Sequence, residues 1–332
     1  MQDLKKVPKI ELHCHLDGAV TPETIFDLLK QKGEEKPLSY IKQQIQVETS
    51  CRDLTEYLTK FDLTLQCIQT PEAMRRVAAE AVENAARDGV IYIEVRFAPQ
   101  IMRLNGLACG QVVENVLLGL ADGQKKTGTI AHAILICMRH HTIDQNLEVV
   151  ETAREFMQKG VAAIDLAGDE AAYPLYLYKD IFLFARKYGI PYTIHAGETG
   201  DQNNIMLAIE YGASRIGHGI KAKNDPKLID FIAEKGVGIE MCPTSNLQTH
   251  SVNSWEEYPV RLFYEKGVKI AVCTDDPVVS NTDLSRELGI LVHHFQFNTH
   301  ELKKIILNSI NMSFASQEEK ERMNRVIQTQ FR

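Results

Sequence analysis

The sequence predicts an α/β protein of the (β/α)8, or TIM barrel, class with extra helices between strands 1 and 2 and at the C-terminus. The main observation is a repeated pattern, in which a polar helical stretch is followed by a glycine and then a short apolar run. Such runs are typical of strands buried on both faces of a parallel sheet. With the opening run they number about eight, and no linker interrupts them. We therefore expect a single domain over residues 1–332.

The expected strands follow in order from the opening run, which ends at His13-Cys14-His15. Later strands are expected over 90–97, 129–138, 161–166, 190–194, 215–217, the residues after Gly236, and 268–274. The glycine before each run is expected to close a helix in the left-handed conformation, because glycine has no Cβ to clash. These glycines are Gly89, Gly128, Gly160, Gly189, Gly212, Gly236 and Gly267.

Residues 16–89 form an unusually long connection between the first two strands, with helical patterns over 52–66 and 71–87. The connection leaves the carboxyl end of the first strand, and barrels of this class keep their active sites at the carboxyl ends of the strands. It is therefore open to two interpretations, a lid or packed scaffold. Residues 301–332 indicate two more amphipathic helices, expected at the bottom or flank of the barrel.

An open, doubly wound sheet is the competing fold. Its usual sign is a glycine-rich turn after the first strand, which Leu16–Ala19 does not provide. Residues 217–222 match G-x-G-x-x-A, but the strand before them is short and the next helix begins only near Asn224. We therefore reject a dinucleotide site and favour the barrel.

The composition excludes several classes of function. The net charge of −7, without a long basic run, disfavours nucleic acid and anionic membranes as partners. No apolar run approaches the ~18 residues that span a bilayer, and the N-terminus lacks the apolar stretch of a secretory signal. Seven scattered cysteines without Cys-x-x-Cys indicate reduced thiols, and hence a cytoplasmic protein.

Side chains able to bind a metal follow several expected strands. Alternate residues of a strand point the same way, so His13 and His15 can converge on one ion while Cys14 faces away. The other strand ends carry Gly168, His195, Glu198, His218, Asp275 and Asp276. Three imidazoles and one carboxylate suit zinc, and a water in the remaining position would make the site catalytic. His218 and Glu198 would then be available to move protons.

These motifs resemble those of the adenosine deaminase family, and the resemblance runs the length of the chain. The matching segments are Leu12–Ala19, Asp165–Glu170, His195–Glu198, Arg215–Gly219, Cys242–Asn246 and Thr274–Pro277. The resemblance implies zinc-dependent hydrolytic deamination of adenosine, and of 2′-deoxyadenosine, to inosine or deoxyinosine and ammonia, in purine salvage. The purine itself comes from this resemblance, whereas the residues alone indicate metal-assisted hydrolysis.

The resemblance also assigns roles to residues. It makes His13, His15, His195 and Asp275 the ligands of one Zn²⁺ per chain. Glu198 resembles the acid that protonates N1 of the purine, and His218 the residue that orients the attacking hydroxide and takes its proton. Asp276 would bind N7, the Gly168 N–H would meet N3, Asp17 would bind a ribose hydroxyl, and His15 would also lie against the ribose.

Asp17 favours a nucleoside over other purines. In relatives that act on the free base this position resembles Glu, and in relatives that act on N6-methylated AMP it resembles Asn. A carboxylate near the sugar also repels a 5′-phosphate. Two alternatives stay open: a deaminase of adenine or 5′-methylthioadenosine, and a non-catalytic barrel that binds a purine or a partner protein. The oligomeric state is not predicted.

Three further sets of residues are interpreted as structural. His140 and His141 follow the third strand, and His293 and His294 lie in a helical stretch. Arg96 ends the second strand, where a structural ion pair is favoured over substrate contact.

Overall fold

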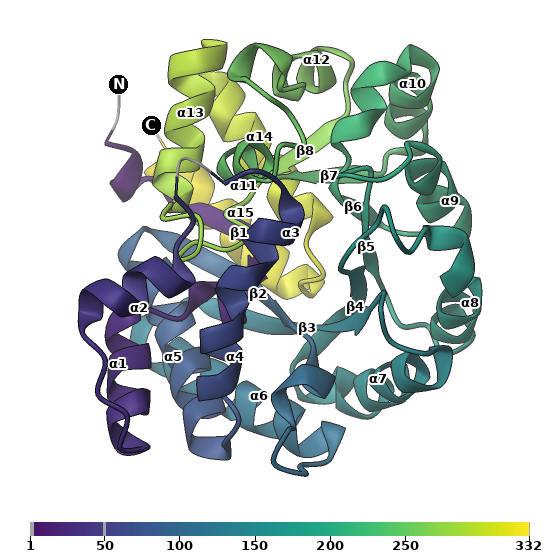
Figure 1. Ribbon diagram of the computed structural model, residues 1–332. Coiled ribbons are helices and arrows are strands. Elements are labelled where there is room, and N and C mark those ends of the chain that lie inside the picture. The colour runs from purple at the N-terminus through teal and green to yellow at the C-terminus, as the bar shows by residue number, and fades with distance from the viewer. Residues whose placement is uncertain (1–2, 49–50, 332) are drawn as a thin grey trace.

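The computed structural model describes residues 3–48 and 51–331, and its strands form a ring that is surrounded by helices (Figure 1). The strands are β1 (Lys9–His15), β2 (Val90–Phe97), β3 (Ile130–Met138), β4 (Val161–Ala167), β5 (Thr193–Ala196), β6 (Arg215–His218), β7 (Gly238–Met241) and β8 (Lys269–Val272). They begin close to the positions that the sequence predicts.

The strands pair in parallel in chain order, as β1-β2-β3-β4 and β5-β6-β7-β8. Single parallel bridges join the two sheets at both seams, between Ile164 and Tyr192 and between Cys14 and Asp275. The second bridge is made by two hydrogen bonds of 2.8 Å, from the Asp275 N–H to the His13 carbonyl and from the His15 N–H to the Asp275 carbonyl. The expected (β/α)8 barrel is therefore confirmed.

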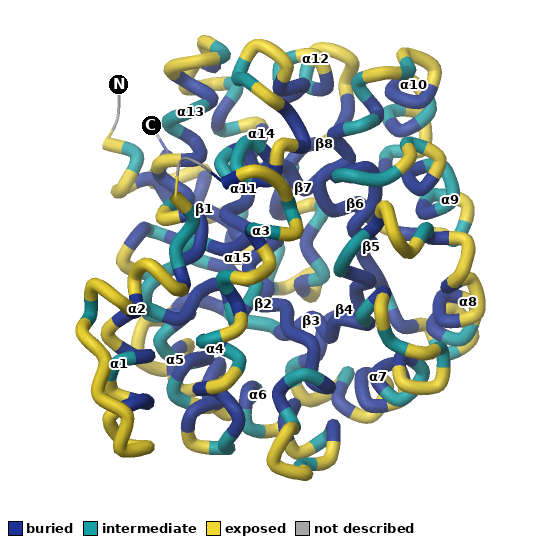
Figure 2. The backbone as a smooth tube through the Cα atoms, in the orientation of Figure 1, coloured by how far each residue is buried: buried dark blue, intermediate teal, exposed yellow. Residues whose placement is uncertain are grey.

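Helices follow the strands, and most of them cover the outside of the barrel. They are α1 (Pro22–Gln31), α2 (Leu38–Ile45), α3 (Leu54–Leu58), α4 (Asp62–Cys67), α5 (Pro71–Arg87), α6 (Cys109–Thr127), α7 (Ile143–Phe156), α8 (Lys179–Lys187), α9 (Asn203–Tyr211), α10 (Pro226–Lys235), α11 (Pro243–Gln248), α12 (Val260–Glu265), α13 (Leu284–Phe295), α14 (Thr299–Met312) and α15 (Gln317–Gln330). Figure 2 shows the strands buried and the outward sides of the helices exposed.

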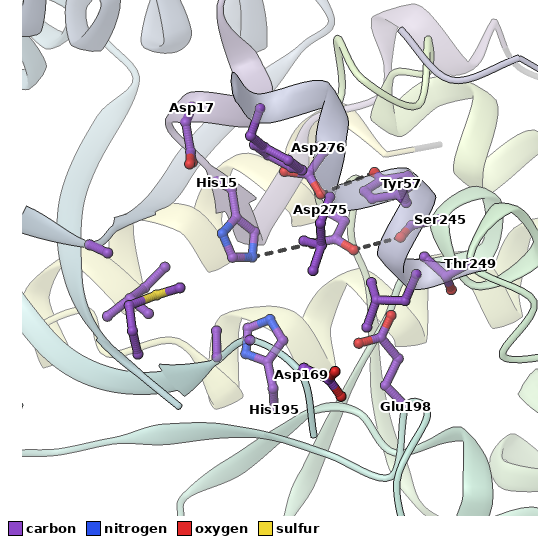
Figure 3. Close-up of a pocket in the computed structure, with 18 of the residues that line it drawn as sticks. His15, Asp17, Tyr57, Asp169, His195, Glu198, Ser245, Thr249, Asp275 and Asp276 are labelled. Carbon is purple, nitrogen blue, oxygen red and sulfur yellow. Dashed lines mark hydrogen bonds and ion pairs between the residues drawn. The ribbon is translucent and has the colours of Figure 1, made fainter. Parts of the chain in front are cut away.

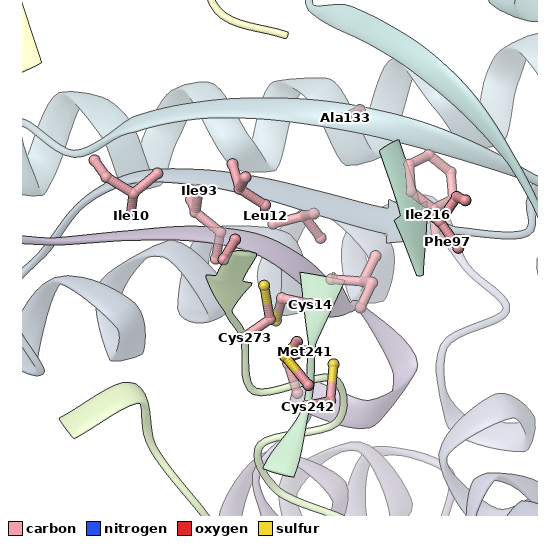
Figure 4. Close-up of a cluster of buried hydrophobic side chains, with 14 of the residues drawn as sticks. Ile10, Leu12, Cys14, Ile93, Phe97, Ala133, Ile216, Met241, Cys242 and Cys273 are labelled. Atoms are coloured by element: carbon pink, nitrogen blue, oxygen red, sulfur yellow. The ribbon is translucent and has the colours of Figure 1, made fainter. Parts of the chain in front are cut away.

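Alternation along β1 separates the apolar core from the interior of the barrel. Ile10, Leu12 and Cys14 join the buried cluster between strands and helices (Figure 4). His13 lies between Leu12 and Cys14 and is also buried, and its ring points into the barrel, where Nδ1 lies 2.7 Å from Glu240 Oε2. One strand therefore contributes both to the core and to the site, and Cys14 faces away from the two histidines as predicted.

Local signals place the helix ends. Each of the seven predicted glycines has a positive φ, for example 80° at Gly128 and 67° at Gly236. At the other end, the Asp225 side chain accepts hydrogen bonds from the first turn of α10, which begins with Pro226. The glycine-to-strand pattern is thus confirmed as a helix-stop signal.

The long connection differs from the expected pattern in one place. The helix expected over 52–66 is divided into α3 and α4 by a 3-10 turn at Thr59–Phe61, whereas 71–87 forms α5 as predicted. We call residues 46–48 and 51–67 the cap, because Val47, Tyr57 and Phe61 in this segment contact the loop that follows β8. The Val47 N–H of the cap donates to the Val279 carbonyl of this loop at 2.9 Å.

The C-terminal region contains α14 and α15, as expected, although Arg332 lies outside the described residues. The turn between them covers the beginning of the strands, where Arg215 of β6 donates to the Met312 carbonyl at 2.8 Å. No helix within residues 3–48 and 51–331 combines the length and apolar character needed to cross a membrane.

Candidate active site

The carboxyl ends of the strands bring the predicted residues to one rim of the barrel. β1 ends at His15, β5 contains His195, β6 ends at His218, and Asp275 follows β8. The parallel register places Ala196 beside His218, so the ends of β5 and β6 coincide. Parallel pairing therefore gathers residues that are far apart in the sequence.

Four of these side chains form one candidate metal site. His13, His15, His195 and Asp275 each offer a ligand atom, and these atoms all lie within 4.8 Å of one another. The Asp275 Oδ1 atom lies 3.0 Å from His13 Nε2 and 3.4 Å from His15 Nε2. Three nitrogen donors and one oxygen donor are a set that suits zinc.

Two buried carboxylates orient the ligand rings from the interior of the barrel. Glu240 Oε2 lies 2.7 Å from His13 Nδ1, and Asp165 Oδ2 lies 2.9 Å from His195 Nδ1. The Nε2 atoms of both rings are thereby left for a metal, which is the usual arrangement in metal sites. This geometry shows that the residues present fit the ion. The sequence pattern does not indicate a role for either carboxylate.

Two arginines inside the barrel hold these carboxylates ionised. Arg96 lies 2.8 Å from both Asp165 and Glu240, and Arg215 also pairs with Glu240. Burial alone would raise the pKa of Glu240, but the charges of Arg96 and Arg215 hold it well below its usual range. The ion pairs agree with the structural role predicted for Arg96.

Asp275 and His218 are held in an uncommon backbone conformation. Their φ angles are 63° and 65°, a region that non-glycine residues rarely adopt. Ser245 donates to Asp275 Oδ2 at 2.7 Å, which leaves Oδ1 for the two histidines. The Asn246 amide nitrogen lies 3.0 Å from His218 Nδ1, so His218 Nε2 is the atom that faces the site.

Glu198 lies beside His218 rather than among the metal ligands. Its Oε2 atom is 3.7 Å from His218 Nε2. Burial raises the pKa of Glu198, which favours its protonated form. Glu170 holds the loop that carries it, accepting hydrogen bonds from the N–H groups of Gly197, Glu198 and Gly200 at 2.6, 3.0 and 3.1 Å.

A cavity of about 350 Å³ opens onto these groups. It is lined by eight of the nine predicted residues, while the ninth, His13, lies buried behind them. These eight are His15, Asp17, Gly168, His195, Glu198, His218, Asp275 and Asp276. Figure 3 shows Asp17, His15 and Asp276 on one side of the cavity, and His195 and Glu198 on the other.

The cap provides an apolar wall of the cavity, which includes Leu54, Tyr57, Leu58 and Phe61. Part of the long connection therefore borders the site, although a lid motion stays a prediction. The cap residues were missed because their helical pattern resembles that of any packed surface helix.

The histidine pairs outside the metal cluster have different surroundings. His140 lines the cavity, whereas the His141 ring contacts the Gln100 side chain at 2.5 Å. His293 and His294 are exposed on α13. The contact of His141 agrees with the structural interpretation, while the position of His140 places it at the cavity.

Comparison with known proteins agrees with this geometry. The family model described as adenosine deaminase matches residues 8–330. The adenosine deaminase of Enterococcus faecalis is 39% identical over 326 residues, which cover 98% of this chain and 97% of that protein.

Solved structures match the fold over nearly the whole chain. An adenine deaminase from Arthrobacter aurescens has a TM-score of 0.90 and 26% identity, with 97% of this chain and 98% of that chain covered. An amidohydrolase from Burkholderia ambifaria with bound Zn has a TM-score of 0.88 and 25% identity, with 99% and 91% covered. Together with the family match, these likenesses show that the chain is an enzyme and belongs to the adenosine deaminase family.

Proposed function

We propose that this enzyme converts adenosine and 2′-deoxyadenosine to the corresponding inosine nucleosides and ammonia, with one Zn²⁺ held by His13, His15, His195 and Asp275. One observation carries the proposal: four metal-ligand atoms within 4.8 Å of one another lie beside Glu198 and His218 on one cavity. Hydrolytic deamination of adenosine is the activity of the family to which the chain belongs. Zinc, when bound, lowers the pKa of a coordinated water to about 7 and so makes hydroxide available at neutral pH.

His218 and Glu198 would move the protons. His218 Nε2 faces the site and is free to orient the attacking water and accept its proton. Glu198, whose pKa is raised by burial, would donate a proton to N1 and make C6 more electrophilic. The water oxygen forms a bond to C6, the bond from C6 to the amino nitrogen breaks, and the leaving group departs as ammonia with the transferred protons.

The remaining residues would bind the base and the sugar. Asp276 would present a proton to N7, which is an acceptor, and the Gly168 N–H would meet N3. Asp17 would accept a hydrogen bond from a ribose hydroxyl, and His15 would lie against the ribose. All four residues line the cavity, which supports their assignment to the substrate.

The compartment and the kind of partner are proposed from the composition of the chain, and its metabolic role from its family. We propose a cytoplasmic location, because its seven cysteines are free and buried. A role in purine salvage is proposed from the family to which the chain belongs. Its partner is a small purine nucleoside, and neither nucleic acid nor membrane is proposed as a partner for a chain of net charge −7. The single domain over residues 1–332 stays a prediction.

A substrate panel tests the proposal. Zinc-loaded protein is followed at the purine absorbance with adenosine, 2′-deoxyadenosine, adenine, AMP and 5′-methylthioadenosine. We expect both nucleosides to be deaminated well and adenine and AMP poorly, with about one zinc per chain by elemental analysis. Faster turnover of adenine or 5′-methylthioadenosine would instead favour those substrates.

A further inference from the structure

We propose that Tyr57 of the cap positions the Asp276 carboxyl for binding of the purine base, so that recognition of N7 depends on contact between the cap and the loop after β8. The inference rests on the proposed function, because it takes Asp276 as the group that binds N7. It adds a positioning residue that lies more than two hundred residues away in the sequence.

The polar contact is direct and buried. The Tyr57 hydroxyl donates to Asp276 Oδ2 at 3.0 Å, and the same hydroxyl lies 2.7 Å from Ser280 Oγ. Since the phenol has one proton, Ser280 must donate to the phenol oxygen when Tyr57 donates to Asp276. The three side chains thus form one chain of hydrogen bonds, and Figure 3 shows its Tyr57–Asp276 link beside the cavity.

The backbone of Gly18 limits the other side of the carboxyl. A Cβ atom at position 18 would lie 1.9 Å from Asp276 Oδ1, so only glycine leaves room for this oxygen. Asp276 Oδ1 is buried and makes no hydrogen bond to the residues that the structure describes. The carboxyl is therefore held between Gly18 and Tyr57, with hydrogen-bonding capacity left for a ligand.

Apolar packing ties this contact to the position of the cap. Tyr57 lies in a small buried cluster with Cys51, Phe61 and Val279, separate from the main core. Val279 belongs to the loop that carries Asp276 and Ser280, and its carbonyl accepts the hydrogen bond from Val47. A cap that moved away from this loop would take the Tyr57 hydroxyl with it, and Asp276 would lose the partner that orients it.

A matched pair of ligands tests the inference without turnover. Both 1-deazaadenosine and 1,7-dideazaadenosine lack N1 and so cannot be protonated there, and they differ only at N7. Their dissociation constants are measured by calorimetry on zinc-loaded wild type and on Tyr57→Phe, which keeps the ring in its cluster. We expect wild type to prefer the ligand with N7. We expect Tyr57→Phe to raise the dissociation constant of the ligand with N7 about five- to tenfold, and that of the other ligand by less than about twofold.

Two further variants sharpen the result. Ser280→Ala removes the donor to the phenol oxygen and should also lower the preference for the ligand with N7, by a smaller factor than Tyr57→Phe does. Tyr192→Phe is the matched control, because its buried hydroxyl donates to the Tyr211 carbonyl and does not line the cavity, so it should leave the preference unchanged.

The outcomes separate the possible failures. An equal loss of affinity for both ligands in Tyr57→Phe would indicate a general structural role and overturn the inference. A preference for the ligand with N7 that stayed at the wild-type value would overturn it too. Equal binding of the two ligands by wild type would also overturn it, while leaving deamination of adenosine intact. Failure of zinc-loaded wild type to deaminate adenosine would instead contradict the proposed function.

Discussion

The interior of the barrel and the cavity above it differ in what surrounds their carboxylates. Inside the barrel, Asp165 and Glu240 are both paired with Arg96, and Glu240 also with Arg215. At the cavity, Glu198 and Asp17 have no arginine or lysine partner in the described part of the chain. The two regions meet at the histidine rings, which face Glu240 and Asp165 on one side and the metal site on the other.

The difference separates carboxylates that stay ionised from those that can carry a proton. Burial alone would raise the pKa of Asp165, but the charges of His195 and Arg96 lower it. Without such partners, burial raises the pKa of Glu198, and it raises that of Asp17 to about 6. The interior therefore supplies fixed charge that orients the ligands, and the cavity supplies groups suited to proton transfer and substrate binding.

The strongest test of the cavity side is loss of the metal ligands. His13→Ala, His195→Ala and Asp275→Ala should each lose the metal and the activity together, because each removes one donor of the four-residue cluster. Metal content by elemental analysis and adenosine turnover are measured on the same samples. Full activity after exhaustive chelation, with no metal detected, would refute the site.

Glu198→Gln should give the next largest effect. Glutamine keeps the shape of the side chain but cannot donate the acidic proton, so kcat should fall by at least about 10²–10⁴-fold. Bound metal and the dissociation constant of a non-hydrolysed nucleoside should stay close to wild type. A variant that kept wild-type kcat would remove Glu198 from proton transfer.

His218→Ala distinguishes a base from a ligand. We expect retained metal and a loss of kcat of about the same size as for Glu198→Gln, because His218 lies outside the four-residue cluster. His218 also groups with Cys242 and Asp275 as a possible second ligand set, so loss of metal in this variant would reverse the assignment.

The cavity side of this comparison could be predicted from the sequence, because strand ends in a parallel barrel meet at one rim. His13 and His15 lie on one face of a strand, and glycine-delimited strands bring His195, His218 and Asp275 to the same end. Roles for individual residues came from the family resemblance, since spacing alone does not separate a ligand from a base.

Of the interior side only the structural ion pair of Arg96 was predicted, and the carboxylates that pair with it were missed, although a signal was present. Asp165 and Glu240 interrupt short apolar strands, and a charged residue in such a strand needs a partner. The partners could not be identified, because Arg96 and Arg215 come from strands distant in the sequence. The Tyr57 contact was missed for the same reason, since no local pattern connects the cap with the loop after β8.

Glu240→Gln tests whether the interior charge supports the metal site. Loss of this carboxylate leaves Arg96 and Arg215 less compensated and His13 without its ionised partner. We expect about 3–5 kcal/mol lower stability and about 10–100-fold weaker metal binding. Asp122→Asn is the control, because its pair with Arg75 is exposed and should contribute at most about 1 kcal/mol. Equal effects of both variants in chemical denaturation and metal titration would remove the distinction between the two regions.

Asp17→Asn addresses substrate choice at the edge of the cavity. Asp17 follows the second histidine ligand by two residues and lines the cavity, where its carboxylate would accept a hydrogen bond from a ribose hydroxyl and repel phosphate. A charge-assisted hydrogen bond contributes about 1.5–3 kcal/mol, so kcat/KM for adenosine should fall about 10–100-fold. The preference for adenosine over AMP should narrow, because asparagine carries no negative charge. Asp17→Glu would push the carboxylate toward the ribose and should impair adenosine more than adenine. An unchanged preference in Asp17→Asn would show that the sugar is recognised elsewhere in the cavity, and would reopen adenine as the substrate.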